Sequence, residues 1–195
     1  MKPIACSFLL LIGQFAFAQT PETFSRQDSL RGSLTPLRTC YDVTYYDLNV
    51  RVDPARKRIE GHNVIHYRVV EDFRRMQLDL FANLRISRIT QGKRILSFTR
   101  EGNAVFVDTG ELQPKGSQQS VTVHYAGNPR PAVNPPWDGG FSWKKDSTGK
   151  PWVAVSCEGV GASLWWPCKD HPSDEPDSVR IRCQVPSSLT CVANG

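Results

Sequence analysis

The sequence predicts an all-β fold, an antiparallel β-sandwich built from many short strands. Residues 46–53 alternate apolar and polar side chains, which is the period of two of a half-buried strand. Short runs of this kind recur along the chain with turn residues between them, and no stretch shows a helical period. Many short strands at close spacing are typical of a sandwich or of an antiparallel sheet folded over on itself.

The chain opens with a predicted secretory signal peptide, residues 1–18. Lys2 precedes an apolar run over residues 4–17, and Ala16-Phe17-Ala18 offers a small-residue cleavage site. The run is short for a membrane span and no second one follows, so an uncleaved anchor helix is the less favoured alternative. We therefore expect a secreted or periplasmic protein with no membrane contact after signal cleavage.

Residues 19–39 are polar, lack a sustained apolar period and are predicted to form an extended arm. The ordered domain is predicted to cover residues 40–195. Within it, residues 46–53 and 59–69 flank an Asp53-Pro54-Ala55 turn and are predicted to pair as a long antiparallel hairpin. In the second of these runs, one face is predicted to carry Ile59, Gly61, Asn63, Ile65, Tyr67 and Val69.

Further strands are predicted wherever a short apolar run is bounded by turn residues. They cover residues 76–81, 85–90, 94–98, 105–108, 121–125, 152–156 and 179–185. The passage from Gly127 to Gly140 is rich in Pro and Gly and is predicted to be a long loop, because Asn134-Pro135-Pro136-Trp137 cannot join a central strand. The chain stops at Asn194-Gly195, a hairpin-turn signal that leads us to expect a returning strand and a longer polypeptide.

The charge pattern argues against a nucleic-acid partner. The formal net charge is +5, but basic side chains are interleaved with acidic ones, as in the hairpin that joins Arg51 and Arg56 to Asp53 and Glu60. A phosphate-binding surface needs clustering as well as net charge. A solvated surface is the better interpretation.

Five cysteines follow the predicted signal peptide, and their pairing stays open. They are Cys40, Cys157, Cys168, Cys183 and Cys191. No C-x-x-C pair occurs, so a zinc ribbon or a thioredoxin-type site is unsupported. In an oxidising compartment one or two disulfides are possible, and Cys183 and Cys191 could close a hairpin, but an odd count leaves at least one thiol over.

The candidate catalytic and metal motifs are all incomplete. The chain has four histidines and no H-E-x-x-H sequence. His62 and His66 share a strand face about 13 Å apart, too far to bind one ion. Ser163 lacks the second glycine of a G-x-S-x-G elbow. Residues 168–177 gather possible cation ligands but contain two prolines and lack the glycine of a calcium loop, so a solvated loop is favoured.

One passage carries a family resemblance. Residues 155–170, VSCEGVGASLWWPCKD, resemble a passage late in the N-terminal domain of aminopeptidase N-like zinc metallopeptidases, the gluzincin aminopeptidase family. The family pattern is a Gln or Glu followed by an aromatic-Pro-Cys-x-Asp cluster at this separation. Residues 59–61, 78–80, 123–127 and 140–141 follow the family's order, so the resemblance covers residues 40–195.

The resemblance implies the fold and one site residue. The fold would be the saddle-shaped antiparallel β-domain that precedes a thermolysin-like catalytic domain. Glu158 matches the acidic or amide residue that binds the substrate's free α-amino group, although an exposed loop Glu without a role is the alternative. Two positions depart from the family: His171 stands where Glu is common and Ser163 where Arg is common. These departures concern hydrogen bonding around the Pro-Cys loop.

The resemblance also implies what lies beyond the chain. One zinc would be held by two His and a Glu of the next domain, past Gly195, so this chain would contain no catalytic residue and no metal site and should be inactive alone. Its partners would be the catalytic domain of the same polypeptide and peptide substrates. The competing hypothesis is a free-standing secreted binding module for peptides or carbohydrates. Its stacking surface would be Trp137, Trp143, Trp152, Trp165 and Trp166, for which core packing and loop anchoring are the favoured explanation.

Overall fold

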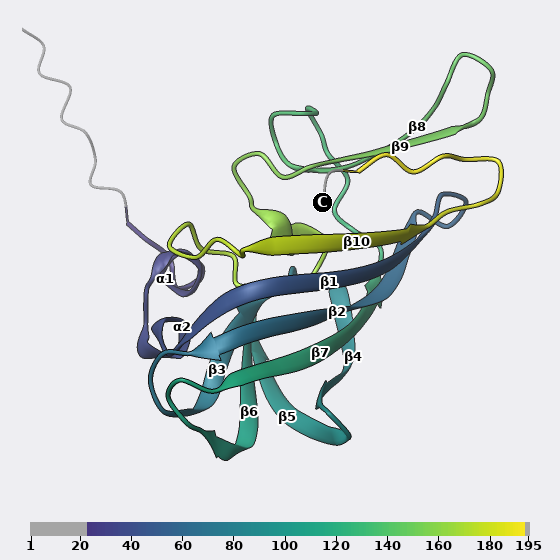
Figure 1. The fold of residues 1–195 in the computed structure, drawn as a ribbon. Coiled ribbons are helices and arrows are strands. Elements are labelled where there is room, and N and C mark those ends of the chain that lie inside the picture. The colour runs from purple at the N-terminus through teal and green to yellow at the C-terminus, as the bar shows by residue number, and fades with distance from the viewer. Residues whose placement is uncertain (1–22, 194–195) are drawn as a thin grey trace, which may run out of the picture.

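The computed structural model describes residues 23–193 (Figure 1). The predicted signal peptide, residues 1–18, lies outside these residues. Most of the described chain is strand, and the all-β prediction is confirmed.

Eight strands form one curled sheet in the order β10-β1-β2-β7-β4-β5-β6-β3. Their bounds are β1 Tyr41–Asp53, β2 Arg58–Val69, β3 Phe73–Asp79, β4 Leu84–Gln91, β5 Arg94–Glu101, β6 Ala104–Gln113, β7 Gln118–Gly127 and β10 Ser178–Gln184. Neighbouring strands are antiparallel except β1 and β10, which run parallel. The sheet folds over on itself, so that β3, β5 and β6 run below and across β1, β2 and β7 (Figure 1).

The core lies between the two halves of this curled sheet. On β2 the buried side chains recur at every second residue near its end, with Ile65, Tyr67 and Val69 at most 1% exposed. Leu48 of β1 and Val123 of β7 are fully buried from the neighbouring strands. Apolar side chains of β3 and β6 close the core from the other half of the sheet. The period of two that predicts the strands is therefore the burial pattern of the sandwich.

The prediction of an extended arm is wrong for the part that the structure describes. Residues 26–39 instead form two short helices, α1 (Arg26–Gly32) and α2 (Pro36–Thr39). Ser25 caps α1 in a reciprocal capping box with Asp28, which satisfies backbone N–H groups at the helix start. With seven and four residues, the helices are too short to show a period of 3.6. The S-x-x-D spacing is the signal from which α1 could have been predicted.

A second strand pair stands apart from the main sheet. β8 (Gly140–Lys145) pairs with β9 (Pro151–Ser156), and the hairpin lies above β10 in Figure 1. The sequence predicts β9 but misses β8, because its six residues directly follow the Pro- and Gly-rich loop. A single 3₁₀ turn, η1 (Ala162–Leu164), interrupts the long connection from β9 to β10.

Candidate functional site

Glu158 lies at the tip of a tight turn that follows β9. The carbonyl oxygen of Cys157 accepts hydrogen bonds from the N–H groups of Val160, at 3.2 Å, and Gly161, at 3.0 Å. These bonds fold residues 157–161 back on themselves, and the Glu158 side chain is left exposed. Its carboxylate is therefore free to meet a group that approaches this end of the domain.

Gly161, at the end of the turn, packs closely against the Asp170 carboxylate. Gly161 has φ +80° and ψ 171°, a combination that essentially only glycine adopts. A β carbon at this position would lie 2.2 Å from an Asp170 carboxylate oxygen. The same oxygen accepts the N–H of Ser163 at 3.1 Å and its hydroxyl at 2.5 Å. Ser163 thus takes part in the hydrogen bonding of the Pro-Cys loop at the position where the family commonly has Arg.

The predicted loop before β8 supports the turn from the other side. Gly139 has φ +64°, and a β carbon there would lie 2.1 Å from Val160 Cγ2 and 3.0 Å from the Glu158 carbonyl oxygen. The Ser156 hydroxyl donates to the carbonyl oxygen of Pro136. The loop and the turn are therefore in direct contact, although at least fifteen residues separate them along the chain.

The same loop brings an aromatic side chain to Glu158. Trp137 is 71% exposed. It lines a shallow hollow of about 470 Å³ together with Glu158. Next to it, the pKa of the Asp138 carboxyl is lowered, first by the nearby backbone N–H of Asn134 and then by that of Val133, which donates to it. The charged Asp138 therefore helps to hold the loop that presents Trp137.

Helix α1 makes one polar contact with the turn and one with the segment that leads into β10. The guanidinium of Arg31 donates to the carbonyl oxygen of Gly159 at 2.8 Å. His171 Nε2 lies 3.2 Å from the carbonyl oxygen of Gly32. The segment that leads into β10 therefore passes beside α1 (Figure 1). Sequence reasoning misses Arg31 because the predicted arm placed no residue near the site.

A buried ion pair anchors the segment below the turn. Arg38 Nη2 lies 2.7 Å from Asp79 Oδ1, and the Arg38 side chain is fully buried. The second Asp79 oxygen accepts the N–H of Asp170 at 3.0 Å. Burial raises the pKa of Asp79 to about 6, against the opposing effect of Arg38. This pair joins α2 and β3 to the connection that carries Asp170.

The acidic segment, residues 168–177, is held by protein partners. Lys169 forms a buried ion pair with Asp174 and donates to the carbonyl oxygen of Tyr41 at 2.7 Å. The Asp174 carboxylate also accepts the N–H of Val43 at 3.3 Å. Among residues 23–193, no group of three or more His, Cys, Asp or Glu side chains is placed to hold a metal ion. The Asp174 carboxylate is therefore buried in an ion pair and is not part of a solvated loop, whereas Glu175 and Asp177 are exposed.

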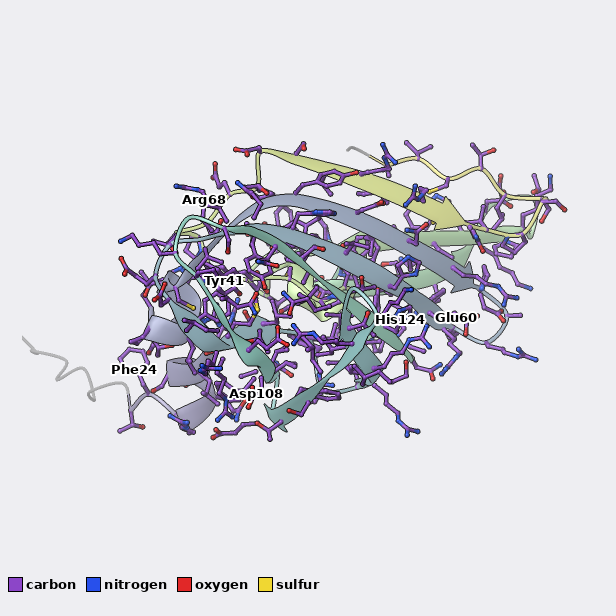
Figure 2. All side chains as sticks on the ribbon, turned by 60° about the horizontal axis from the view of Figure 1, so that its bottom comes forward. Phe24, Tyr41, Glu60, Arg68, Asp108 and His124 are labelled. Carbon is purple, nitrogen blue, oxygen red and sulfur yellow. The ribbon has the colours of Figure 1, made fainter. Side chains whose placement is uncertain are left out.

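The two histidines of the 59–69 run lie on β2, as predicted. The histidine that lies close to His62 is His124 rather than His66. His62 on β2 and His124 on β7 face each other, and their ring centroids are 5.2 Å apart. His124 lies near Glu60 on the same side of the sheet (Figure 2). His66 stacks near Tyr45. Which side chains pair across two strands depends on the strand register, and the sequence does not show that register.

The five tryptophans do not act as one surface. Trp143, Trp165 and Trp166 are partly buried and pack against the core, and Trp165 and Trp166 contact each other edge to face. Trp137 and Trp152 are 71% and 51% exposed. Core packing therefore explains three of the five.

The chain is similar to solved zinc metallopeptidases. An M1 zinc metallopeptidase from Deinococcus radiodurans shares 24% identity with a TM-score of 0.62, over 76% of this chain and 33% of that chain. A mutant two-domain M1 zinc metallopeptidase bound to L-arginine shares 26% identity with a TM-score of 0.61 and the same coverage. Yeast LTA4 hydrolase shares 18% identity with a TM-score of 0.62, over 76% of this chain and 23% of that chain. The sequence matches no family model and no curated protein.

These comparisons confirm the resemblance drawn from residues 155–170. The fold fits the N-terminal domain of an aminopeptidase N-like zinc metallopeptidase. The chain spans about a third of the length of the M1 structures that it matches.

Proposed function

We propose that this chain is the N-terminal, substrate-anchoring domain of an exported zinc aminopeptidase, and that Glu158 binds the free α-amino group of its peptide substrates. The observation that carries the proposal is the placement of Glu158. Its carboxylate is exposed on a turn that Gly139, Arg31 and Asp170 hold from three sides. Similar M1 structures hold L-arginine and a Tyr-Ser-Ala substrate, ligands that carry a free α-amino group.

The chemistry of Glu158 suits this role. A carboxylate and an ammonium group form a charge-assisted hydrogen bond that strengthens when water is excluded. The nitrogen of an internal peptide bond is uncharged and gains no such interaction. The exposed face of Trp137 lines the same hollow, and an aromatic face attracts a cation within about 6 Å of its centroid. Glu158 would therefore select chain ends and orient them.

Zinc belongs to the whole enzyme in this proposal. No group of three or more His, Cys, Asp or Glu side chains in residues 23–193 is placed to hold a metal ion, and the proposal assigns the zinc ligands to the catalytic domain. When bound in the catalytic domain, zinc supplies an activated water for attack on the scissile carbonyl. The described part of this chain binds and positions the amino end of the substrate.

Export is the part of the proposal that rests on residues 1–18. No helix in the described part of the chain is long and apolar enough to cross a membrane. We expect the mature protein to begin at Gln19, after the Ala16-Phe17-Ala18 site. Amino-terminal sequencing of the protein from its native host tests this, and a chain that retains residues 1–18 would contradict it.

Kinetics of the full-length enzyme test the role of Glu158. Glu158→Ala should lower kcat/KM for an aminoacyl substrate by about 10- to 100-fold, the equivalent of one lost charge-assisted hydrogen bond. Glu158→Gln keeps an acceptor and should lose less. Glu175→Ala, which removes an exposed carboxylate elsewhere in the same connection, is the matched control and should leave the kinetics unchanged. If wild type and Glu158→Ala have the same kcat/KM, Glu158 does not bind the substrate.

The free-standing binding module is less well supported, because three of the five tryptophans pack against the core. Reading the coding sequence past Gly195 discriminates between the two. An in-frame H-E-x-x-H followed by a more distant Glu supports the aminopeptidase, whereas a stop codon or an unrelated domain supports the module.

A further inference from the structure

Two of the five described cysteines share one apolar groove. Cys183 is half-buried on β10, and Cys191 is exposed in the segment that follows. Both line a groove of about 520 Å³, together with Val185 and Leu189 from the same segment and with residues of β1 and β9. The structure holds both as free thiols.

A turn brings the two thiols together. The carbonyl oxygen of Pro186 accepts the N–H of Leu189 at 2.9 Å, which closes a β-turn midway between the cysteines. The chain reverses there and returns Cys191 to the side of Cys183. Burial is the main cause that raises the pKa of Cys183 to about 12, and the neighbouring Cys191 thiol adds to it. Both thiols therefore lie on the same side of the turn, in the groove that they line together.

The other three cysteines are poorly placed for oxidation. Cys40 is 5% exposed and Cys168 is 3% exposed, so an external oxidant cannot reach either sulfur. Cys157 is partly buried, as Cys183 is, but it lines the hollow beside Glu158, which contains no other cysteine among its lining residues. Cys191 is the exposed thiol among residues 23–193, and Cys183 is its neighbour.

We propose that Cys183 and Cys191 form an intramolecular disulfide that fastens the segment after β10 to the edge of the sheet. The oxidant is another disulfide, either oxidised glutathione or a disulfide-bearing protein. The Cys191 thiolate attacks one sulfur of that disulfide, forms a mixed disulfide and releases the first thiol. The Cys183 thiolate then attacks the Cys191 sulfur, forms the new bond and releases the second thiol. The two cysteines lose two protons and two electrons, and the oxidant takes up both pairs.

The bond would stiffen the segment that crosses the apolar groove. Cross-linking two residues that are close in sequence restricts the unfolded chain and blocks local opening of the segment between them. The inference is independent of Glu158. It depends on the exported location only for the supply of oxidant in the cell, which a defined buffer replaces in the test.

Peptide mapping of the full chain tests the pairing. The protein is equilibrated in a glutathione buffer of the redox poise found in oxidising compartments, alkylated without reduction and digested with trypsin. Trypsin cleaves after Arg182, and residues 183–195 contain no Lys or Arg, so both cysteines fall on one peptide. That peptide should have lost two hydrogens and carry no alkyl group, and reduction should allow two alkyl groups to be added. Chymotrypsin, which cleaves after Leu189, should leave its two halves joined.

Two variants serve as controls. Cys157→Ser should leave the loss of two hydrogens unchanged, whereas Cys191→Ser should abolish it and leave Cys183 open to alkylation after denaturation. Alkylation of both Cys183 and Cys191 in the oxidised wild type would overturn the proposal. A linkage of either residue to Cys157 or to a second chain would overturn it as well.

Discussion

Replacing Gly161 with alanine should destabilise the domain more than the same change at Gly159, two residues earlier in the Glu158 turn. Both glycines have positive φ, +80° at Gly161 and +66° at Gly159. A β carbon at Gly161 would lie 2.2 and 2.3 Å from the two carboxylate oxygens of Asp170, whereas no atom lies within 4 Å of the corresponding position at Gly159. Both changes strain the backbone, but only Gly161→Ala displaces a neighbour.

The difference can be worked from these contacts. A non-glycine residue with this backbone strain costs about 1–2 kcal/mol, which is the expected loss for Gly159→Ala. At Gly161 the Asp170 carboxylate must also move, and it accepts two hydrogen bonds from Ser163. Hydrogen bonds to a charged group contribute about 1.5–3 kcal/mol each. Partial loss of the two brings the expected total for Gly161→Ala to about 4 kcal/mol.

Equilibrium unfolding in urea, followed by tryptophan fluorescence, measures both variants. Asp170→Ala should cost less in the Gly161→Ala background than in the wild type, because the hydrogen bonds that it removes are already weakened there and the two changes are not additive. Equal losses of unfolding free energy for Gly159→Ala and Gly161→Ala would refute the role assigned to Asp170. Strict additivity in the double variant would also count against it.

Three further changes probe the surroundings of the turn. Lys169→Met should lower the unfolding free energy by about 3–5 kcal/mol, because it leaves a buried carboxylate unpaired, and an unchanged urea midpoint would contradict this. The pKa of Asp138 is lowered below its ordinary value of 3.8, first by the N–H of Asn134. The charged carboxylate therefore stabilises the folded protein above pH 3.8, and this stabilisation is lost as the pH falls through the pKa of the folded state. Hydrogen exchange in its loop should accelerate below about pH 4 beyond the intrinsic pH dependence, and Asp138→Asn should remove that acceleration; identical profiles would refute it. Arg31→Ala should speed amide exchange in the Glu158 turn while the urea midpoint changes little, because the lost hydrogen bond is exposed; exchange rates equal to wild type would contradict the contact's role.

The strands were predictable because their burial alternates with the period of the backbone. Ile65, Tyr67 and Val69 show this on β2, where apolar side chains face the core at every second residue. The helices were not predicted because α1 buries a single apolar side chain, Leu30, and no period can emerge from one residue. The capping box at Ser25 was the available signal, and it is local rather than periodic.

The site was only partly predictable. Glu158 follows from the resemblance of residues 155–170 to a known family, and the structure places it on an exposed turn. The contacts that hold the turn come from Arg31 and Gly139, which lie far from it in sequence and carry no motif. Such long-range contacts depend on how the sheet curls and on where α1 packs. The spacing of residues along the chain predicts neither.

The residues that depart from the family pattern have identifiable partners. Ser163 donates twice to Asp170, and His171 lies within hydrogen-bonding distance of Ser173 and of the Gly32 carbonyl. Both therefore contribute to the loop below Glu158.

Calorimetric binding to the full-length enzyme tests the central claim most directly. The ligands are a free amino acid such as L-arginine and its analogue that lacks the α-amino group. Wild type should bind the amino acid at least about 10-fold more tightly than the analogue, and Glu158→Ala should bring the two affinities together, because the carboxylate acts only on the ammonium group. If the preference for the amino acid survives in Glu158→Ala, Glu158 does not bind the α-amino group.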